Sequence, residues 1–203
     1  MRKNRRRMKK KVRLFVTMFL LIGLLFAGKT LANDLLATDS SKQVLKAYQK
    51  SAKKLNSGNP IIEATIANGM ELVGKSPYVW GGGRTDESIT KDEFDCSSFV
   101  AMMFYLGGQQ IDLQSQTTTY TLVDVGLQSN WLAKERGDLL FDKELEHVVI
   151  YLGDDYILHD SPNSSTGGVG INRLSDVINK DKLGDMTWEE FLEDGYVRTQ
   201  VVG

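Results

Sequence analysis

The 203-residue chain is poor in the residues that form disulfides and metal sites, since it contains one cysteine and two histidines. A single thiol cannot form an internal disulfide, so the hydrophobic core must supply the stability. Neither a paired cysteine nor a His-x-x-x-His spacing is present, and we therefore expect no metal site and no cofactor. What remains is the thiol of Cys96, which is either a small buried side chain or a reactive group.

Acidic residues are absent from the first 32 positions, which hold ten of the 25 Lys and Arg residues and none of the 26 Asp and Glu residues. The rest of the chain therefore carries 15 basic against 26 acidic side chains, a net charge of −11. A surface with this excess of negative charge repels the phosphate backbone of nucleic acids. We expect no nucleic-acid partner.

The same 32 residues are typical of a targeting segment. A basic stretch that ends at Arg13 is followed by an apolar run over residues 14–27, and residues 30–32 offer a small-residue cleavage site. The run is about 14 residues long, shorter than the roughly 20 that a spanning helix prefers. We predict a secreted or cell-envelope protein in which residues 1–32 are either a cleaved signal peptide or a membrane anchor through residues 14–27. No cysteine lies nearby to carry a lipid, which excludes a lipoprotein.

The remaining 171 residues or so are enough for one domain of ordinary size. Residues 33–58 are polar and rich in lysine, with a thin apolar stripe. We interpret them as a spacer that is either partly helical or disordered, because so thin a stripe gives a helix little to pack with. Residues 59–203 are expected to form the single folded domain.

Two helices are marked by their start and stop signals. Asn59-Pro60 combines an N-cap residue with proline at the first helical position, and the apolar face that follows should end near Gly74. Asp95 is a suitable N-cap for a second helix over residues 96–106, which a pair of glycines would stop. This second helix places Cys96 in its first turn.

The second half of the chain changes to short apolar segments separated by turn residues, which is typical of strands. Gly153-Asp154-Asp155 predicts a hairpin turn, and a short helix is expected over residues 183–192. Helices followed by a small antiparallel sheet predict an α+β fold. The expected strands are Asp138–Phe141, His147–Leu152, Tyr156–His159, Val169–Leu174 and Tyr196–Val202.

Cys96 and the two histidines are the candidate catalytic residues. Unpaired N–H groups at the start of a helix favour a thiolate, so we expect a lowered pKa and an activated nucleophile at Cys96. His147 is the candidate general base, and His159 is the candidate for orienting its ring. If the strands that carry the histidines form a hairpin, side chains twelve residues apart become cross-strand neighbours at its open end.

Each of these residues also has a plainer interpretation. A lone cysteine is often a buried hydrophobic residue, and a histidine in a strand is often a satisfied core residue. Tyr78 and Trp80 are core aromatics by default, and the three glycines that follow them form a turn. Trp131 and Trp188 are interpreted as packing residues, and residues 114–119 as a solvated loop or a short helix.

Five segments of the chain, in this order, resemble the motifs of the NlpC/P60 cell-wall endopeptidases. They are Pro77–Gly82, Phe94–Val100, Arg136–Phe141, His147–Gly153 and Tyr156–His159. The resemblance covers about residues 59–202 and implies a papain-like cysteine peptidase fold, with N-terminal helices packed on a small antiparallel sheet. It also implies hydrolysis of the stem peptides of bacterial peptidoglycan, commonly at the bond from D-γ-glutamate to the diamino acid.

The resemblance further implies roles for individual residues. The nucleophile, the base and the orienting residue are, in turn, Cys96, His147 and His159. The residues that face the substrate are Tyr78, Asp95 and Ser97. Besides capping its helix, Asp95 would hold the free amino group of an L-alanine at the end of a stem peptide, through a charge-assisted hydrogen bond.

The chain departs from the family pattern at two positions. Ser98 stands where a glycine usually follows Cys-Ser, and Asp142 stands where a second aromatic residue usually follows the Gly-Asp strand. Neither residue belongs to the catalytic set. The departures are therefore expected to change the shape of the groove and the substrate preference more than the activity.

Two other functions fit the same residues. One is an amidase of a related papain-like branch, which cuts between the lactyl group of the sugar and L-alanine. The other is a catalytically silent envelope protein that binds wall peptides in the groove. The complete cysteine and histidine set weighs against the second, because a binding module has no use for a thiolate.

Overall fold

The computed structural model describes residues 40–109, 117–178 and 185–200. The predicted targeting segment, residues 1–32, lies outside them. Within the described ranges, no helix is both long and apolar enough to cross a membrane. The unit of the chain that holds these residues begins at Ser40, inside the predicted spacer.

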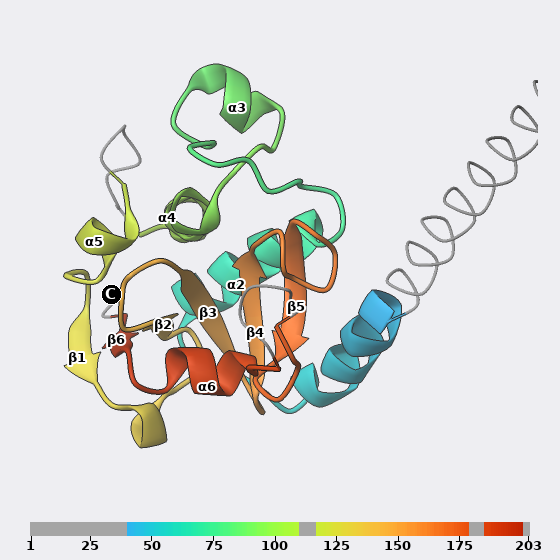
Figure 1. The fold of residues 1–203 in the computed structure, drawn as a ribbon, viewed down its shortest axis with the longest axis vertical. Helices are drawn as coiled ribbons and strands as arrows, with labels where there is room; N and C mark the ends of the chain where they lie inside the picture. Colours follow the sequence, from blue (N-terminus) through green and yellow to red (C-terminus); the bar gives the residue numbers. More distant parts are fainter. Residues whose placement is uncertain (1–39, 110–116, 179–184, 201–203) are drawn as a thin grey trace, which may run out of the picture. The chain divides into compact units, whose positions relative to one another are not determined.

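The centre of the fold is a six-stranded antiparallel sheet with the strand order β1-β6-β2-β3-β4-β5 (Figure 1). The predicted α+β class is confirmed. Four of the five expected strands are found to within one residue at each end, and the fifth starts at Tyr196 as predicted. The strands are β1 (Leu127–Ser129), β2 (Leu139–Phe141), β3 (Val148–Gly153), β4 (Tyr156–Asp160), β5 (Val169–Arg173) and β6 (Tyr196–Thr199).

Helices cover both faces of this sheet, because successive side chains of a strand point to opposite sides. One face, which carries Ile150, packs against α2 (Pro60–Leu72) and α4 (Cys96–Gly107). The other face, which carries Tyr151, packs against α6 (Trp188–Leu192) (Figure 1). Burial on both sides explains why the central strands are apolar throughout rather than alternating.

The helix signals in the sequence are confirmed. The Asn59 side chain accepts hydrogen bonds from the backbone N–H groups two and three positions further on, at 2.9 and 3.3 Å. Asp95 caps α4 by accepting from the backbone N–H of Ser98 at 2.9 Å, while Ser98 Oγ accepts from the N–H of Asp95 at 3.0 Å. Gly108 ends α4 with φ at 107°, a conformation that glycine adopts without strain.

The shortest elements are the ones that the sequence pattern misses. The polar stretch after the glycine turn contains α3, and the predicted helix over residues 183–192 begins at Trp188, with residues 179–184 outside the described ranges. Three to five residues are too few to show a helical or strand period, so no pattern could reveal them. The missed elements are α3 (Asp86–Thr90), α5 (Thr119–Leu122), the 3-10 turn η1 (Trp131–Ala133) and β1.

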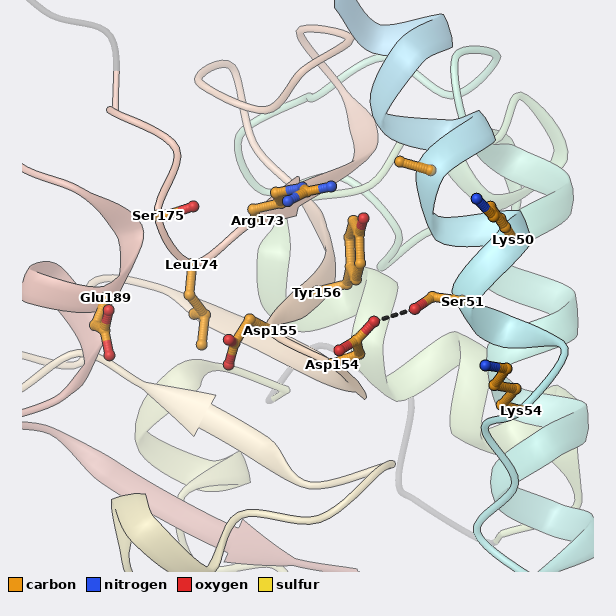
Figure 2. A pocket seen from close by; sticks show the side chains of 11 residues that line it. Lys50, Ser51, Lys54, Asp154, Asp155, Tyr156, Arg173, Leu174, Ser175 and Glu189 are labelled. Atoms are coloured by element: carbon orange, nitrogen blue, oxygen red, sulfur yellow. Dashed lines mark hydrogen bonds between the residues drawn. The ribbon is translucent and has the colours of Figure 1, made fainter.

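Residues 40–52 form a helix that packs on this domain (Figure 2). Tyr48 is buried, and its hydroxyl accepts a hydrogen bond from Arg136 Nη1 at 3.0 Å. The Ser51 hydroxyl donates to the carboxylate of Asp154, in the turn between β3 and β4 (Figure 2). This part of the predicted spacer therefore contributes to the core.

The Arg136 guanidinium joins this helix to α2 and β3. Its Nε and Nη2 donate to the two carboxylate oxygens of Glu63 at 2.9 and 2.8 Å, and Nη1 donates to the Leu152 carbonyl at 2.6 Å. A guanidinium that binds a carboxylate through two parallel hydrogen bonds makes one of the stronger ionic contacts in proteins. Hydrogen bonding to Arg136 lowers the pKa of Glu63 to about 2.

We expect Arg136→Met to lower the free energy of unfolding by about 1–3 kcal/mol, because it leaves Glu63 and the Leu152 carbonyl without their donor. Urea unfolding at neutral pH measures the change. The matched control is Lys91→Met, which removes an exposed ion pair with Glu87 and should change stability by less than about 0.5 kcal/mol. Equal losses in the two variants would contradict the role given to Arg136.

Candidate active site

Cys96 is the first residue of α4, as the sequence predicts, and its side chain is buried. The backbone N–H of Val148 donates a hydrogen bond to the thiol. Val148 opens β3 and directly follows His147. The packing of α4 on the sheet therefore brings the thiol to the strand that carries the candidate base.

The two histidines lie side by side, as predicted for the hairpin. β3 and β4 pair with Ile150 opposite Leu158, a register that places His159 opposite Val149, so His147, just before β3, is a diagonal neighbour of His159 across the two strands. Nε2 of His147 lies 2.9 Å from Nδ1 of His159. This contact engages one ring nitrogen of His147 and leaves Nδ1 as its nitrogen for proton exchange.

Trp188 of α6 packs against both imidazoles, with ring centroids 5.5 Å from His147 and 4.5 Å from His159. The indole is 2% exposed. The interpretation of Trp188 as a packing residue alone is therefore incomplete, because this ring keeps water away from the histidine pair. Nothing in the sequence near α6 distinguishes it from an ordinary core aromatic.

Burial works against charge on all three candidate catalytic groups. Burial, followed by the Asp95 carboxylate, raises the pKa of Cys96 to about 12. Burial also lowers the pKa of His159 to about 4 and that of His147 well below its ordinary value. The prediction of a lowered thiol pKa is therefore wrong, because desolvation outweighs the N–H groups at the start of the helix. The resting site holds a neutral thiol and two neutral imidazoles.

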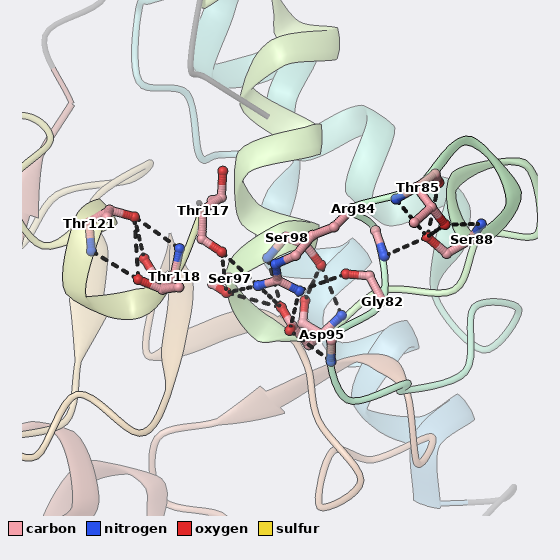
Figure 3. Close-up of polar contacts among 12 residues, drawn as sticks. Gly82, Arg84, Thr85, Ser88, Asp95, Ser97, Ser98, Thr117, Thr118 and Thr121 are labelled. Atoms are coloured by element: carbon pink, nitrogen blue, oxygen red, sulfur yellow. Dashed lines mark hydrogen bonds and ion pairs between the residues drawn. The ribbon is translucent and has the colours of Figure 1, made fainter. Parts of the chain in front are cut away.

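The Asp95 carboxylate is held by Arg84, a residue that sequence reasoning missed (Figure 3). The guanidinium donates to the two carboxylate oxygens at 2.5 and 3.2 Å, to Ser97 Oγ at 3.0 Å and to the Thr117 carbonyl at 2.6 Å. Burial alone would raise the pKa of Asp95, but hydrogen bonds, from Arg84 above all, lower it. Arg84 follows a glycine turn in a stretch without periodicity, so no sequence pattern indicates that it belongs to the site.

The two departures from the family pattern both hold the backbone of the site. Asp142 accepts hydrogen bonds from the backbone N–H groups of His147 at 2.6 Å and Glu144 at 3.0 Å. Ser98 completes the capping box at the start of α4. The expectation that these positions act mainly on the groove is therefore too narrow, since each one sets the position of a candidate catalytic residue.

Tyr78 lies close to the thiol. Its backbone forms a parallel bridge with Phe94, and the neighbouring Val79 N–H donates to the Phe94 carbonyl at 2.7 Å. Burial, followed by the electrostatic influence of Cys96, raises the pKa of the Tyr78 phenol. The phenol therefore stays protonated and able to donate a hydrogen bond near Cys96.

A cleft of about 600 Å³ opens at Cys96, and Asp95, Ser97 and Arg84 also line it. The histidines are buried and do not line the cleft. Trp80, expected in the core, is 84% exposed and lies at this cleft instead. The predicted residues thus form two groups, because Asp95, Cys96 and Ser97 line a cleft with a mainly apolar lining, while the two imidazoles are buried away from it.

A buried carboxyl group, that of Asp160, lies near the site. Asp160 follows His159 in β4, is fully buried, and neither of its oxygens has a hydrogen-bond partner among the described residues. Burial, followed by the Asp95 charge, raises the pKa of Asp160 to about 8. At neutral pH this side chain is mostly protonated, which keeps a second negative charge away from Cys96.

A cysteine at the start of a helix, with that helix packed on an antiparallel sheet whose neighbouring strands bring two histidines together, is the arrangement of the papain-like class of folds. The model of the NlpC/P60 family matches residues 74–186. The chain belongs to this family. The peptidoglycan DL-endopeptidase CwlO of Bacillus licheniformis is 40% identical over 128 residues, which are 62% of this chain and 27% of that protein. The chain thus aligns with about a quarter of its curated relative.

Solved structures share the fold. The P60 domain of an antigen from M. avium subspecies paratuberculosis aligns with a TM-score of 0.50 and 24% identity, over 70% of this chain and 96% of that domain. A protein of the NLP/P60 family from Staphylococcus aureus aligns with a TM-score of 0.51 and 19% identity, over 70% of this chain and 42% of that one. The papain-like fold expected from the sequence is confirmed.

The contribution of Asp160 to stability should fall as the pH rises from about 4 to about 8. The unfolded carboxyl ionises near pH 3.8 and the folded one near 8, so the folded state holds one more proton in this range. Asp160→Asn removes this titration and should reduce the fall by up to about 1.4 kcal/mol per pH unit. Urea unfolding at several pH values measures the slope. The exposed control Asp124→Asn should leave the slope unchanged, and an unchanged slope in Asp160→Asn would contradict the buried proton.

Proposed function

We propose that this chain is a peptidoglycan hydrolase that cleaves stem peptides with Cys96, His147 and His159. The observation that carries the proposal is the 2.9 Å contact between two buried imidazoles, one of which directly precedes Val148, the residue whose backbone N–H donates to the thiol at the start of α4. A core built only for stability gains little from burying two adjacent imidazoles, because each must give up water. The name of the relative CwlO states the same class of activity, which supports the proposal.

In the proposed reaction, His147 takes the proton of the Cys96 thiol while the sulfur attacks the carbonyl carbon of the scissile amide. When the tetrahedral intermediate collapses, the C–N bond breaks and the leaving amine receives that proton from His147. A water molecule, deprotonated by His147, then attacks the thioester. The sulfur leaves, takes up the proton from His147 and returns to the thiol.

A neutral resting site suits this sequence of steps. Moving a proton from Cys96 to His147 creates a pair of opposite charges in a buried place, which is unfavourable unless each charge has a partner. The Val148 N–H that reaches the sulfur stabilises the thiolate. His159, 2.9 Å from His147, accepts a hydrogen bond from the imidazolium. These two contacts favour formation of the thiolate during the attack.

We further infer that Tyr78, Asp95 and Ser97 face the stem peptide near Cys96. Arg84 already matches the Asp95 carboxylate at 2.5 Å, so the pair offers little net charge to a free amino group. This argues against the earlier expectation that Asp95 holds the free amino group of an L-alanine. It favours stems that are still attached to sugar, because these carry no such amine.

The DL-endopeptidase name of the relative and the family resemblance both favour cleavage between D-γ-glutamate and the diamino acid. Peptidoglycan lies outside the cytoplasmic membrane, so the enzyme must be exported to meet it. The predicted targeting segment would provide that export. Secretion and attachment through residues 14–27 both remain part of the proposal.

Mass spectrometry of muropeptides after digestion of purified peptidoglycan tests this function. We expect fragments cut after D-glutamate from the wild-type chain and none from Cys96→Ala, because the alanine variant keeps the cap and core of α4 but has no nucleophile. Circular dichroism should show the same fold for both. Cuts before L-alanine would identify an amidase, and peptidoglycan bound without any cut would identify a binding protein. Unchanged cleavage by Cys96→Ala would exclude the cysteine mechanism.

The two histidines should be unequal in their effect on the rate. His147→Ala should lose as much kcat/KM as Cys96→Ala, because the base has to exchange protons in every step. His159→Asn and His159→Gln should retain part of the rate, because an amide oxygen can accept the hydrogen bond from the His147 ring. The measurement is kcat/KM on purified peptidoglycan. Equal loss in all three histidine variants would assign a proton-transfer role to His159 as well.

A further inference from the structure

Asn172, in the edge strand β5, forms a further hydrogen bond to the histidine pair. Its Oδ1 lies 3.1 Å from Nε2 of His159, whose other nitrogen, Nδ1, contacts His147. His159 is fully buried and Asn172 is 7% exposed. Water is therefore a poor substitute for this contact, and the two side chains must satisfy each other. Nothing in the sequence pattern marks Asn172.

The contacts of Asn172 settle which end of its amide faces the histidine. The backbone N–H of Ser165 donates to the same Oδ1 at 2.9 Å, and a backbone N–H can only meet an oxygen. The Nδ2 group donates to the Asp176 carboxylate at 3.1 Å, and a carboxylate oxygen only accepts. Asp176 also accepts from the backbone N–H of Arg173 at 2.8 Å. The oxygen of Asn172 is therefore held toward His159.

This orientation determines the proton positions on both rings. Because Oδ1 of Asn172 is an acceptor, Nε2 of His159 must carry a proton. Burial keeps His159 neutral by lowering its pKa to about 4, so its Nδ1 has a free lone pair. Nε2 of His147 must then donate to that lone pair, which leaves Nδ1 of His147 unprotonated. An unprotonated Nδ1 is the form that a base needs in order to accept the proton of Cys96.

We propose that Asn172 is a positioning residue that acts through His159 to keep His147 in the tautomer with a free Nδ1, and that Asp176 holds the Asn172 amide in place. The proposal rests on the proposed function, in which His147 is the base. Without the Asn172 oxygen, the buried Nε2 proton of His159 has no partner. A proton on Nδ1 of His159 then becomes competitive, and it turns Nε2 of His147 into an acceptor and puts the His147 proton on Nδ1.

Nitrogen NMR tests the tautomers directly, because these two histidines are the only ones in the chain. The full-length Cys96→Ala variant is used so that no thiol exchanges protons with His147. Two-bond proton–nitrogen correlations should show both rings protonated at Nε2 and bare at Nδ1. A proton on Nδ1 of His159 in this variant would overturn the proposal, whether or not the chain hydrolyses peptidoglycan.

The matched substitutions are Asn172→Leu and Asn163→Leu, each made in the wild-type and the Cys96→Ala chain. Leucine at position 172 removes the acceptor but keeps the branched shape of the side chain, and Asn163 is exposed and has no side-chain hydrogen bond to the histidines. In the Cys96→Ala chain, Asn172→Leu should add a population with a protonated Nδ1 on both rings. Asn163→Leu should leave the spectrum unchanged.

With Cys96 present, Asn172→Leu should lower kcat by about 10- to 100-fold on purified peptidoglycan, the loss that removal of a hydrogen-bond partner causes at metal-binding histidines. KM should stay within about twofold, because the change does not touch the cleft. Asn163→Leu should match the wild type. Loss of activity with unchanged tautomers would mean that Asn172 has only a structural role, and unchanged kcat would mean that it does not position the base. Either result would overturn the proposal.

Two controls keep this test separate from the proposed function. If Asn172→Leu does not fold, the tautomers of the Cys96→Ala chain still decide the proposal, because that spectrum needs no change at position 172. If the wild-type chain cuts no stem peptide, the proposed function fails, while the spectrum still shows whether Asn172 sets the proton positions of the two rings.

Discussion

The hydrogen bonding of the rest of the site depends on the burial of two adjacent imidazoles. With Trp188 against both rings and water excluded, every ring nitrogen needs a partner within the protein or from the reaction. The pairing of β3 with β4 places His147 against His159, and β5 adds Asn172 behind them. The sheet thus joins three residues on three neighbouring segments into one line of hydrogen bonds, with His147 at one end and Asn172 at the other.

Negative charge near the thiol is limited in two different ways. Asp95 caps α4 with its carboxylate, and Arg84 balances its charge through hydrogen bonds to both carboxylate oxygens. Asp160 has no partner among the described residues and is kept neutral by burial, with a pKa of about 8. Both arrangements reduce the repulsion that a thiolate at Cys96 would meet. This reduction in repulsion matters more for a buried nucleophile with a raised pKa than for an exposed one.

Several parts of this protein could be predicted from the sequence because the signals are local. The caps Asn59 and Asp95, the strand boundaries and the β3–β4 turn depend on residues within a few positions of one another, and the structure confirms them. The hairpin turn also explains why the two histidines, twelve residues apart, are neighbours across β3 and β4. The motif resemblance supplied the family and the papain-like fold, which the family match and the shared architecture of the solved structures support.

Tertiary structure alone decided the charge states and the supporting residues. Whether the Cys96 pKa rises or falls depends on how far the whole fold buries the thiol, and desolvation proved larger than the local helix effect. Arg84, Trp188 and Asn172 come from a loop, a short helix and an edge strand, and each reaches the site through packing between segments distant in sequence. A sequence pattern shows only local periodicity and capping residues, so it does not reveal contacts between distant segments.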